Sequence, residues 1–86
     1  MEYDYNSNKI TTKAGKMIII PNTENDILNY LYERKGTVCT AEEISNYLYG
    51  DYDGVKTVKV FVTRLRNRIG KTIKIRTIYK KGYIID

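Results

Sequence analysis

The side chains with the clearest capacity for chemistry are the cations of one stretch, KTVKVFVTRLRNRI, at residues 56–69. The stretch contains no glycine, proline or acidic residue. Ammonium and guanidinium groups neutralise phosphates, and hydroxyl, amide and methyl groups contact base edges. Arg64 carries a forked group that can donate to both N7 and O6 of a guanine. The composition therefore predicts binding to duplex DNA, and the alternative is a plain solvated surface, since Lys and Arg are common on exposed helices.

A helix over residues 56–69 would gather these side chains on one side. Its apolar residues recur at i, i+4, i+7 and i+11 and so share a face; they are Val58, Val62, Leu65 and Ile69. At about 100° per residue, the far side carries Lys56, Val60, Thr63, Arg64 and Asn67. Arg66 and Arg68 flank the apolar stripe, where their stems lie along the body and their charges point outward. We expect Arg68 to lie at the surface or to pair with an acid of the same chain.

Residues suited to catalysis are scarce. There is no histidine, and Cys39 follows an apolar link without an evident base, so we expect it to be a small buried side chain. The carboxylates cluster at helix starts and in one loop, where capping and solvation explain them, and no metal-ligand spacing exists. We therefore expect no enzyme activity, no catalytic residue, no cofactor and no metal site.

The nine tyrosines raise the alternative of a stacking platform for single strands. Five of them, however, fall in or beside the predicted core stripes, which disfavours that interpretation. These five are Tyr30, Tyr32, Tyr47, Tyr49 and Tyr83.

Length and charge set the broad class. The 86 residues predict one domain, and the net charge of +5 favours nucleic acid or another anionic surface as partner. A single cysteine allows no internal disulfide, so a cytoplasmic location is the simplest expectation. The longest apolar run, residues 17–20, is too short to span a bilayer, and the acidic start MEYDYNSN does not fit a signal peptide.

The remaining elements follow from turn and capping signals. Residues 1–20 predict a small antiparallel sheet of up to three strands, which Pro21 ends because it lacks an N–H. Residues 22–70 predict three helices, the first capped by Asn22 or Thr23 and the second by a capping box at residues 40–43. Residues 73–86 predict a hairpin with a tight turn at residues 79–82. The expected fold is α+β, a winged helix-turn-helix whose wing is this hairpin.

Four segments carry a family pattern. Residues 20–31 read IPNTENDILNYL, residues 37–50 TVCTAEEISNYLYG, residues 56–70 KTVKVFVTRLRNRIG and residues 75–85 IRTIYKKGYII. In the same order, these segments resemble four segments of the winged-helix effector domain of OmpR/PhoB-type response regulators, which read LTPTEFRLLEYL, VVSREELLEAVWG, RTVDVHISRLRRKLG and IRTVRGVGYRL. The motifs TV.V.V.RLR and RT…GY are specific together, and the resemblance covers nearly all of the chain.

The resemblance implies a sequence-specific DNA-binding transcription regulator. It puts the recognition helix at residues 56–69 in the major groove and the wing tip at residues 79–82 at the minor groove. The residues expected to contact bases are Lys59, Val60, Thr63, Arg64 and Asn67. The residues expected to contact phosphates or the minor groove are Lys56, Thr57, Arg66, Thr77, Tyr79, Lys80 and Lys81.

The sequence departs from the family pattern at several of these positions. Lys59 replaces an Asp, and Phe61 replaces a phosphate-contacting His, so Phe61 is expected in the core. Tyr79 and Lys80 replace the Arg-Gly pair of the wing, which removes the arginine of the narrow groove. A receiver domain needs far more chain than precedes Ile10, so regulation by phosphorylation of this chain is not expected unless it is a fragment of a longer regulator.

The main alternative function is a protein-interaction module that docks on RNA polymerase or another regulator. The loop expected to serve such a partner consists of Asp51, Tyr52 and Asp53. The resemblance also raises the hypothesis of a tandem homodimer on direct repeats of DNA.

Overall fold

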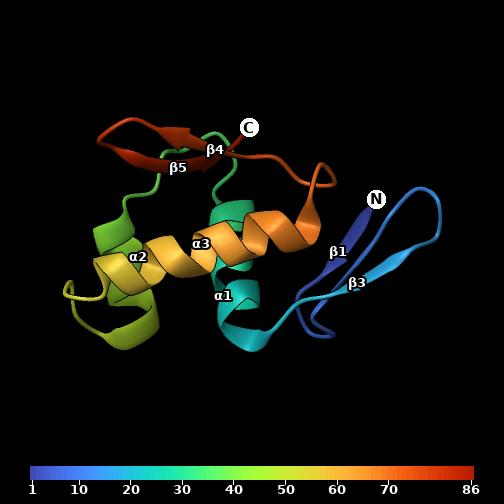
Figure 1. Cartoon of the computed structure of the whole chain (residues 1–86), viewed down its shortest axis with the longest axis horizontal. Coiled ribbons are helices and arrows are strands. Elements are labelled where there is room, and N and C mark those ends of the chain that lie inside the picture. Colours follow the sequence, from blue (N-terminus) through green and yellow to red (C-terminus); the bar gives the residue numbers. More distant parts are fainter.

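The computed structural model describes all 86 residues (Figure 1). Strands β1 (Glu2–Asp4), β2 (Lys9–Thr11) and β3 (Met17–Ile19) form an antiparallel sheet in that order. Helices α1 (Asn22–Glu33), α2 (Ala41–Tyr49) and α3 (Val55–Ile69) follow, and then an antiparallel hairpin of β4 (Ile75–Ile78) and β5 (Gly82–Ile85). The expected α+β winged helix-turn-helix fold is confirmed.

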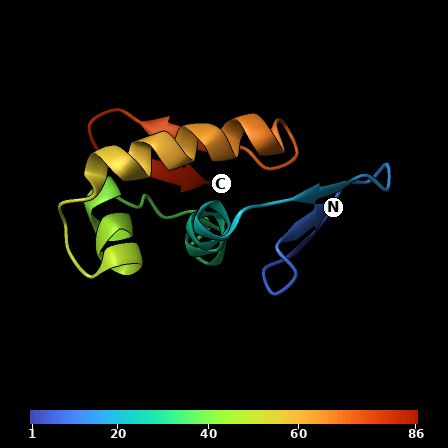
Figure 2. The same ribbon diagram turned by 60° about the horizontal axis from the view of Figure 1, so that its bottom comes forward.

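Figure 1 shows α3 crossing the middle of the molecule, with α1 behind it and α2 beside its start. The β4–β5 hairpin lies along one side of the helices. The N-terminal sheet stands at the far end of the molecule from α2, and the turned view of Figure 2 shows the same arrangement. The recognition helix predicted from the sequence is thus the central element of the fold.

The apolar seam of α3 is buried as its spacing predicts. Val58, Val62, Leu65 and Ile69 are each at most 2% exposed. They join one core cluster of 17 buried residues to which all three helices, β2 and the hairpin contribute. Cys39 belongs to this cluster and is 1% exposed, as expected, and Phe61 packs against it while partly buried. Since one core joins the three helices and the hairpin, α3 is held at a fixed place on the body.

The second helix begins and ends as expected. The Thr40 hydroxyl accepts a hydrogen bond from the Glu43 N–H at 3.0 Å, and the Glu43 carboxylate accepts one from the Thr40 N–H at 2.6 Å. Gly50 ends the helix in the left-handed conformation, with φ of 76°. Both features depend on residues within a few positions of each other, and this is why the sequence predicts them.

The predicted cap of α1 is wrong. Neither Asn22 nor Thr23 caps the helix; both lie inside it, and Pro21 occupies the capping position without a side-chain bond. The Asn22 side chain instead accepts a hydrogen bond from the Asn8 amide at 2.7 Å. It is therefore used to fasten the helix to the N-terminal hairpin rather than to close the helix start.

Of the five tyrosines expected in or beside the core stripes, Tyr47 and Tyr49 are 47% and 46% exposed. One element boundary differs from the expectation. The first hairpin strand begins at Ile75 rather than Ile73, because the residues after α3 form a turn in which the Thr72 N–H donates to the Ile69 carbonyl at 3.1 Å.

The hairpin is anchored to the body along β5. Cys39, in the link between α1 and α2, forms a bridge with Tyr83 in which each N–H donates to the other's carbonyl at 2.8 Å. The Gly36 N–H donates to the Ile85 carbonyl at 2.8 Å. Strand β4 pairs only with β5, so it forms the outer edge of this small sheet.

None of α1, α2 and α3 has the length and the apolar composition that a bilayer-spanning helix requires.

Candidate nucleic-acid interface

The outer face of α3 is open to solvent along its whole length. The predicted contact residues on it are all exposed, and Val60 keeps 49% of its surface accessible. These residues are Lys56, Thr57, Lys59, Val60, Thr63, Arg64 and Asn67. The structure contains two ion pairs, and neither involves a cation of this face. The charges of the face are therefore free to meet an anionic partner.

Two side chains on this face have local contacts that orient them. The Thr63 hydroxyl donates to the Lys59 carbonyl one turn earlier, at 3.0 Å. The Arg64 guanidinium carbon lies 5.5 Å from the centre of the Phe61 ring, within range of a cation–π contact. Phe61, which stands where the family has a phosphate-contacting histidine, thus supports the arginine with the best capacity to read a guanine.

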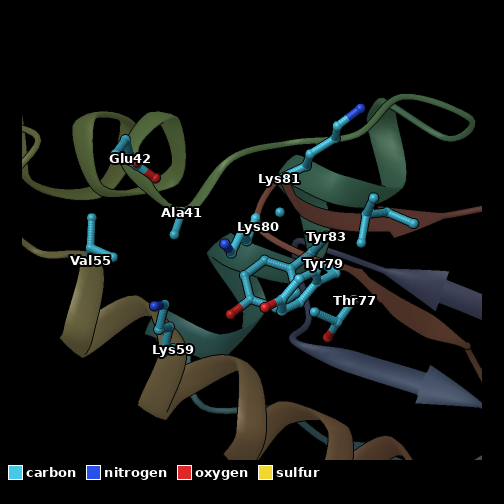
Figure 3. Close-up of a pocket in the computed structure, with 11 residues that line it drawn as sticks. Ala41, Glu42, Val55, Lys59, Thr77, Tyr79, Lys80, Lys81 and Tyr83 are labelled. Carbon is cyan, nitrogen blue, oxygen red and sulfur yellow. The ribbon is translucent and has the colours of Figure 1, made fainter.

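A cavity of about 390 Å³ separates α3 from the tip of the hairpin. Its walls come from the start of α2, the start of α3 and residues 77–83. Figure 3 shows Lys59 and Lys80 directed into this space from opposite sides, whereas Lys81 points away from it. Glu42 supplies the acidic side chain of the lining. Two ammonium groups and the positive end of a helix make this hollow electropositive.

The hairpin tip is a tight turn that presents one aromatic and two cationic side chains. The Lys81 N–H closes it by donating to the Ile78 carbonyl at 2.9 Å. Lys80 adopts a left-handed conformation with φ of 59°, where the family pattern has glycine. Tyr79 is 81% exposed, and the Lys80 ammonium lies 5.4 Å from its ring centre.

Two residues predicted to contact phosphates or the minor groove, Arg66 and Thr77, are hydrogen-bonded to each other. An Arg66 Nη2 donates to the Thr77 hydroxyl at 2.6 Å, and the guanidinium lies 5.4 Å from the centre of the Tyr83 ring. Burial raises the pKa of the Tyr83 phenol, and Arg66 acts in the opposite direction. Arg66 is only partly exposed, unlike the other cations of the predicted set. The sequence does not reveal this pair, because the two residues lie on different elements.

Arg68 pairs with an acid, as expected. Its Nε donates to the Glu24 carboxylate at 3.0 Å, and the glutamate side chain is only 4% exposed. The pair joins the end of α3 to the start of α1. From the sequence, carboxylates at helix starts are explained by capping and solvation alone, so the burial of Glu24 and its distant partner were missed.

The loop between α2 and α3 is fixed by one buried hydroxyl. Ser45, fully buried, donates to the Asp51 carbonyl at 2.8 Å and accepts from the Gly54 N–H at the same distance. An Asp51 carboxylate oxygen accepts from the Asp53 N–H at 2.9 Å. The Tyr52 side chain is left 61% exposed at the tip of the loop.

Nothing in the arrangement resembles a metal site, since no three His, Cys, Asp or Glu side chains lie close enough together to hold an ion. Burial raises the pKa of the Cys39 thiol, which makes it a poor nucleophile. What this surface can do is bind: it presents cations, hydrogen-bonding groups and a methyl-bearing side chain on one exposed ridge.

The chain is similar to known proteins over most of its length. The family model described as "Transcriptional regulatory protein, C terminal" matches residues 15–85. The cell cycle response regulator CtrA of Brucella ovis is 32% identical over 83 residues, which are 90% of this chain and 36% of that protein. The chain thus spans about a third of the length of the curated relatives it matches.

Two solved structures show the same fold. The DNA-binding domain of Bacillus subtilis CssR superposes with a TM-score of 0.82 at 29% identity, covering 94% of this chain and 93% of that one. The DNA-binding domain of Klebsiella pneumoniae RstA, solved in complex with the RstA box, superposes with a TM-score of 0.74 at 25% identity. It covers 86% of this chain and 79% of the RstA chain.

Proposed function

Because this chain belongs to the family of transcriptional regulatory protein C-terminal domains, the OmpR/PhoB-type DNA-binding domains, we propose that it binds double-stranded DNA sequence-specifically and regulates transcription. The observation that carries the proposal is the open outer face of α3, whose cations have no acidic partner, beside the basic tip of the hairpin. The likeness to RstA, whose structure contains its DNA box, supports the same role.

In the proposed complex α3 lies in a major groove. Arg64 donates to N7 and O6 of a guanine, and such a bidentate contact discriminates against the wrong base by about 1–3 kcal/mol. Val60 packs against a thymine methyl group, which explains an exposed apolar residue on a polar face. Lys59, Thr63 and Asn67 contact neighbouring base edges.

Other side chains of α3 and the hairpin tip contact the DNA backbone and the minor groove. Lys56 and Thr57 at the start of α3 contact phosphates, which positions the helix without reading the sequence. Lys80 and Lys81 bring charge to the minor groove at the hairpin tip, where the neighbouring Tyr79 is also exposed. Each phosphate neutralised by a lysine releases counterions, so we expect affinity to fall steeply as salt is added.

Selection of bound duplexes from a random pool, followed by footprinting, tests the proposal directly. We expect one enriched motif protected over a major groove and an adjacent minor groove. A pool that yields no enriched motif, with weak binding to all duplexes, would reduce the function to generic adhesion to DNA. No retention on any duplex at low salt would overturn DNA binding altogether.

Two variants separate reading from positioning. Arg64→Ala should lose affinity for the selected site and little for scrambled duplex. Lys56→Ala should lower the affinity for both duplexes alike, and the slope of log affinity against log salt concentration (the salt slope) should fall in magnitude by about one. Equal losses on both duplexes for both variants would count against the residue roles.

A second candidate function is docking on a protein such as RNA polymerase through Asp51, Tyr52 and Asp53. The observation that favours it is the rigid loop with Tyr52 61% exposed at its tip, since exposed aromatics anchor protein interfaces. Tyr52→Ala combined with Asp53→Ala should leave DNA affinity unchanged and abolish capture of purified RNA polymerase. Loss of DNA binding in this variant would contradict a separate role for the loop.

We also propose that two copies bind direct repeats in tandem. Band shifts with one and with two half-sites test this, because cooperative pairing raises affinity on the double site beyond that of two independent sites. Equal affinity per half-site on both probes would rule out pairing.

A further inference from the structure

One side-chain hydrogen bond connects α3 with the hairpin, and it joins Arg66 to Thr77. The backbone anchors of the hairpin, at Tyr83 and Ile85, all lie on β5. Strand β4, which carries Thr77, is the outer edge of the sheet. The Arg66 contact is therefore the polar tie between the helix and this free edge.

The guanidinium of Arg66 is committed to the protein itself. One Nη2 is bonded to Thr77, the Nε is buried without a partner, and the planar group lies 5.4 Å from the centre of the Tyr83 ring. The predicted phosphate contact Lys56, by contrast, is exposed on the outer face and keeps its donors in solvent. A planar fork can bond a hydroxyl and lie near an aromatic ring at once, which an ammonium group cannot do equally well.

We propose that Arg66 is a positioning residue that sets the distance between α3 and the hairpin tip, rather than a phosphate contact. The inference rests on the proposed DNA-binding function, because that function requires α3 and residues 79–82 to reach two adjacent grooves together. Holding the hairpin in place before DNA arrives removes an ordering cost from binding. Thr77 takes part as the acceptor on β4.

The free protein provides the first test. Backbone ¹⁵N relaxation gives order parameters for the amides at residues 79–82, with the amides of α3 as an internal reference. In the wild type we expect values near the rigid limit of about 0.85, and in Arg66→Met and Thr77→Val a fall toward about 0.6. Arg66→Lys keeps the charge but loses the planar guanidinium group, so the order parameters should fall in this variant as well. Unchanged order parameters in all three variants would overturn the inference.

Binding to DNA provides the second test, with two duplexes that carry the selected site. One is full length, and the other ends before the segment that footprinting assigns to the hairpin. On the full duplex Arg66→Lys, Arg66→Met and Thr77→Val should each lose affinity several-fold, with the salt slope unchanged and no further loss in the Arg66→Met/Thr77→Val double variant. On the short duplex these losses should disappear.

A phosphate contact predicts the opposite pattern. Arg66→Lys would then bind like the wild type, Arg66→Met would lower the salt slope by about one, and Arg66→Met and Thr77→Val would be additive. Lys56→Met serves as the matched control, because this exposed cation should lower the salt slope on both duplexes.

The outcomes also separate the inference from the function on which it rests. Failure of the wild type to bind any duplex overturns the proposed function and the role of Arg66 with it. If the wild type binds DNA but the affinity losses of Arg66→Met and Thr77→Val add up in the double variant, only the role of Arg66 is overturned. Thermal unfolding followed by circular dichroism shows whether each variant is folded. If Arg66→Met does not fold, Arg66→Lys, the mildest change, still allows the test.

Discussion

Gly82→Ala should detach the hairpin from the body of the protein. Gly82 has a φ of 154°, and a Cβ there would collide with the Cys39 carbonyl oxygen and lie 2.9 Å from the Cα of Thr40. Both neighbours are backbone atoms of the link before α2, so no side-chain movement relieves the collision. The cheapest relief is to open the bridge between Cys39 and Tyr83.

The magnitude follows from what the opened bridge loses. Its two hydrogen bonds, each 2.8 Å long, contribute about 0.5–1.5 kcal/mol apiece. The unfavourable backbone conformation adds about 1–3 kcal/mol, so the free energy of unfolding should fall by about 2–6 kcal/mol. For a domain of this size, at about 4–8 °C per kcal/mol, we expect the Tm to drop by about 8–48 °C.

Thermal unfolding by circular dichroism measures this loss, and the reaction of Cys39 with Ellman's reagent reports where it arises. Cys39 is 1% exposed and burial raises the pKa of its thiol, so the wild type should react slowly and Gly82→Ala faster. Gly36→Ala is the matched control: its φ of 83° is also unfavourable for alanine, but a Cβ there meets nothing within 4 Å. Equal losses of stability in the two variants, with Cys39 equally slow in both, would refute the steric argument.

Three further predictions concern other parts of the fold. Arg68→Met leaves the Glu24 carboxylate, 4% exposed, without a cation; urea unfolding should show a loss of about 1–3 kcal/mol, and a double variant with Glu24→Gln should lose less. Ser45→Ala removes both hydrogen bonds that fix the loop between α2 and α3, so it should cost about 1–3 kcal/mol and speed amide exchange in that loop; unchanged exchange would contradict the bracing role. Hydrogen bonding to Arg76 holds the pKa of Asp86 below its usual range, so the folded pKa lies below the unfolded one, and the stabilisation is present at neutral pH and lost on acidification through the folded pKa. Stability measured from neutral to acidic pH should therefore decline less in Asp86→Asn than in the wild type, and parallel curves would argue against the pair.

Features encoded within one or two turns of chain could be read from the sequence. The four seam residues of α3 alternate with the helical period, so their burial follows from spacing alone. The capping box needs only Thr40 and Glu43, three residues apart, and it forms as predicted. The family motifs then linked these local elements into a winged helix, which the structure confirms.

Contacts between distant residues could not be read in the same way. Glu24 and Arg68 are 44 positions apart, and Arg66 and Thr77 belong to a helix and a strand whose separation only the folded chain defines. The cap of α1 failed for the same reason, because Asn22 has a competing partner in the N-terminal hairpin. The exposed positions of α3 were predicted correctly, but which DNA groups each one meets stays a prediction.

The base-contacting residues predicted on α3 are separate from its buried seam, and this separation has a consequence for how the protein can change. Val60, Thr63 and Asn67 contribute nothing to the buried interior, while Val58, Val62 and Leu65 never reach the surface. Evolution or protein design can replace these outward side chains so that the protein binds a different operator, with the Tm unchanged. Base preference can therefore change through a few substitutions on the outer face of α3 while the fold is kept.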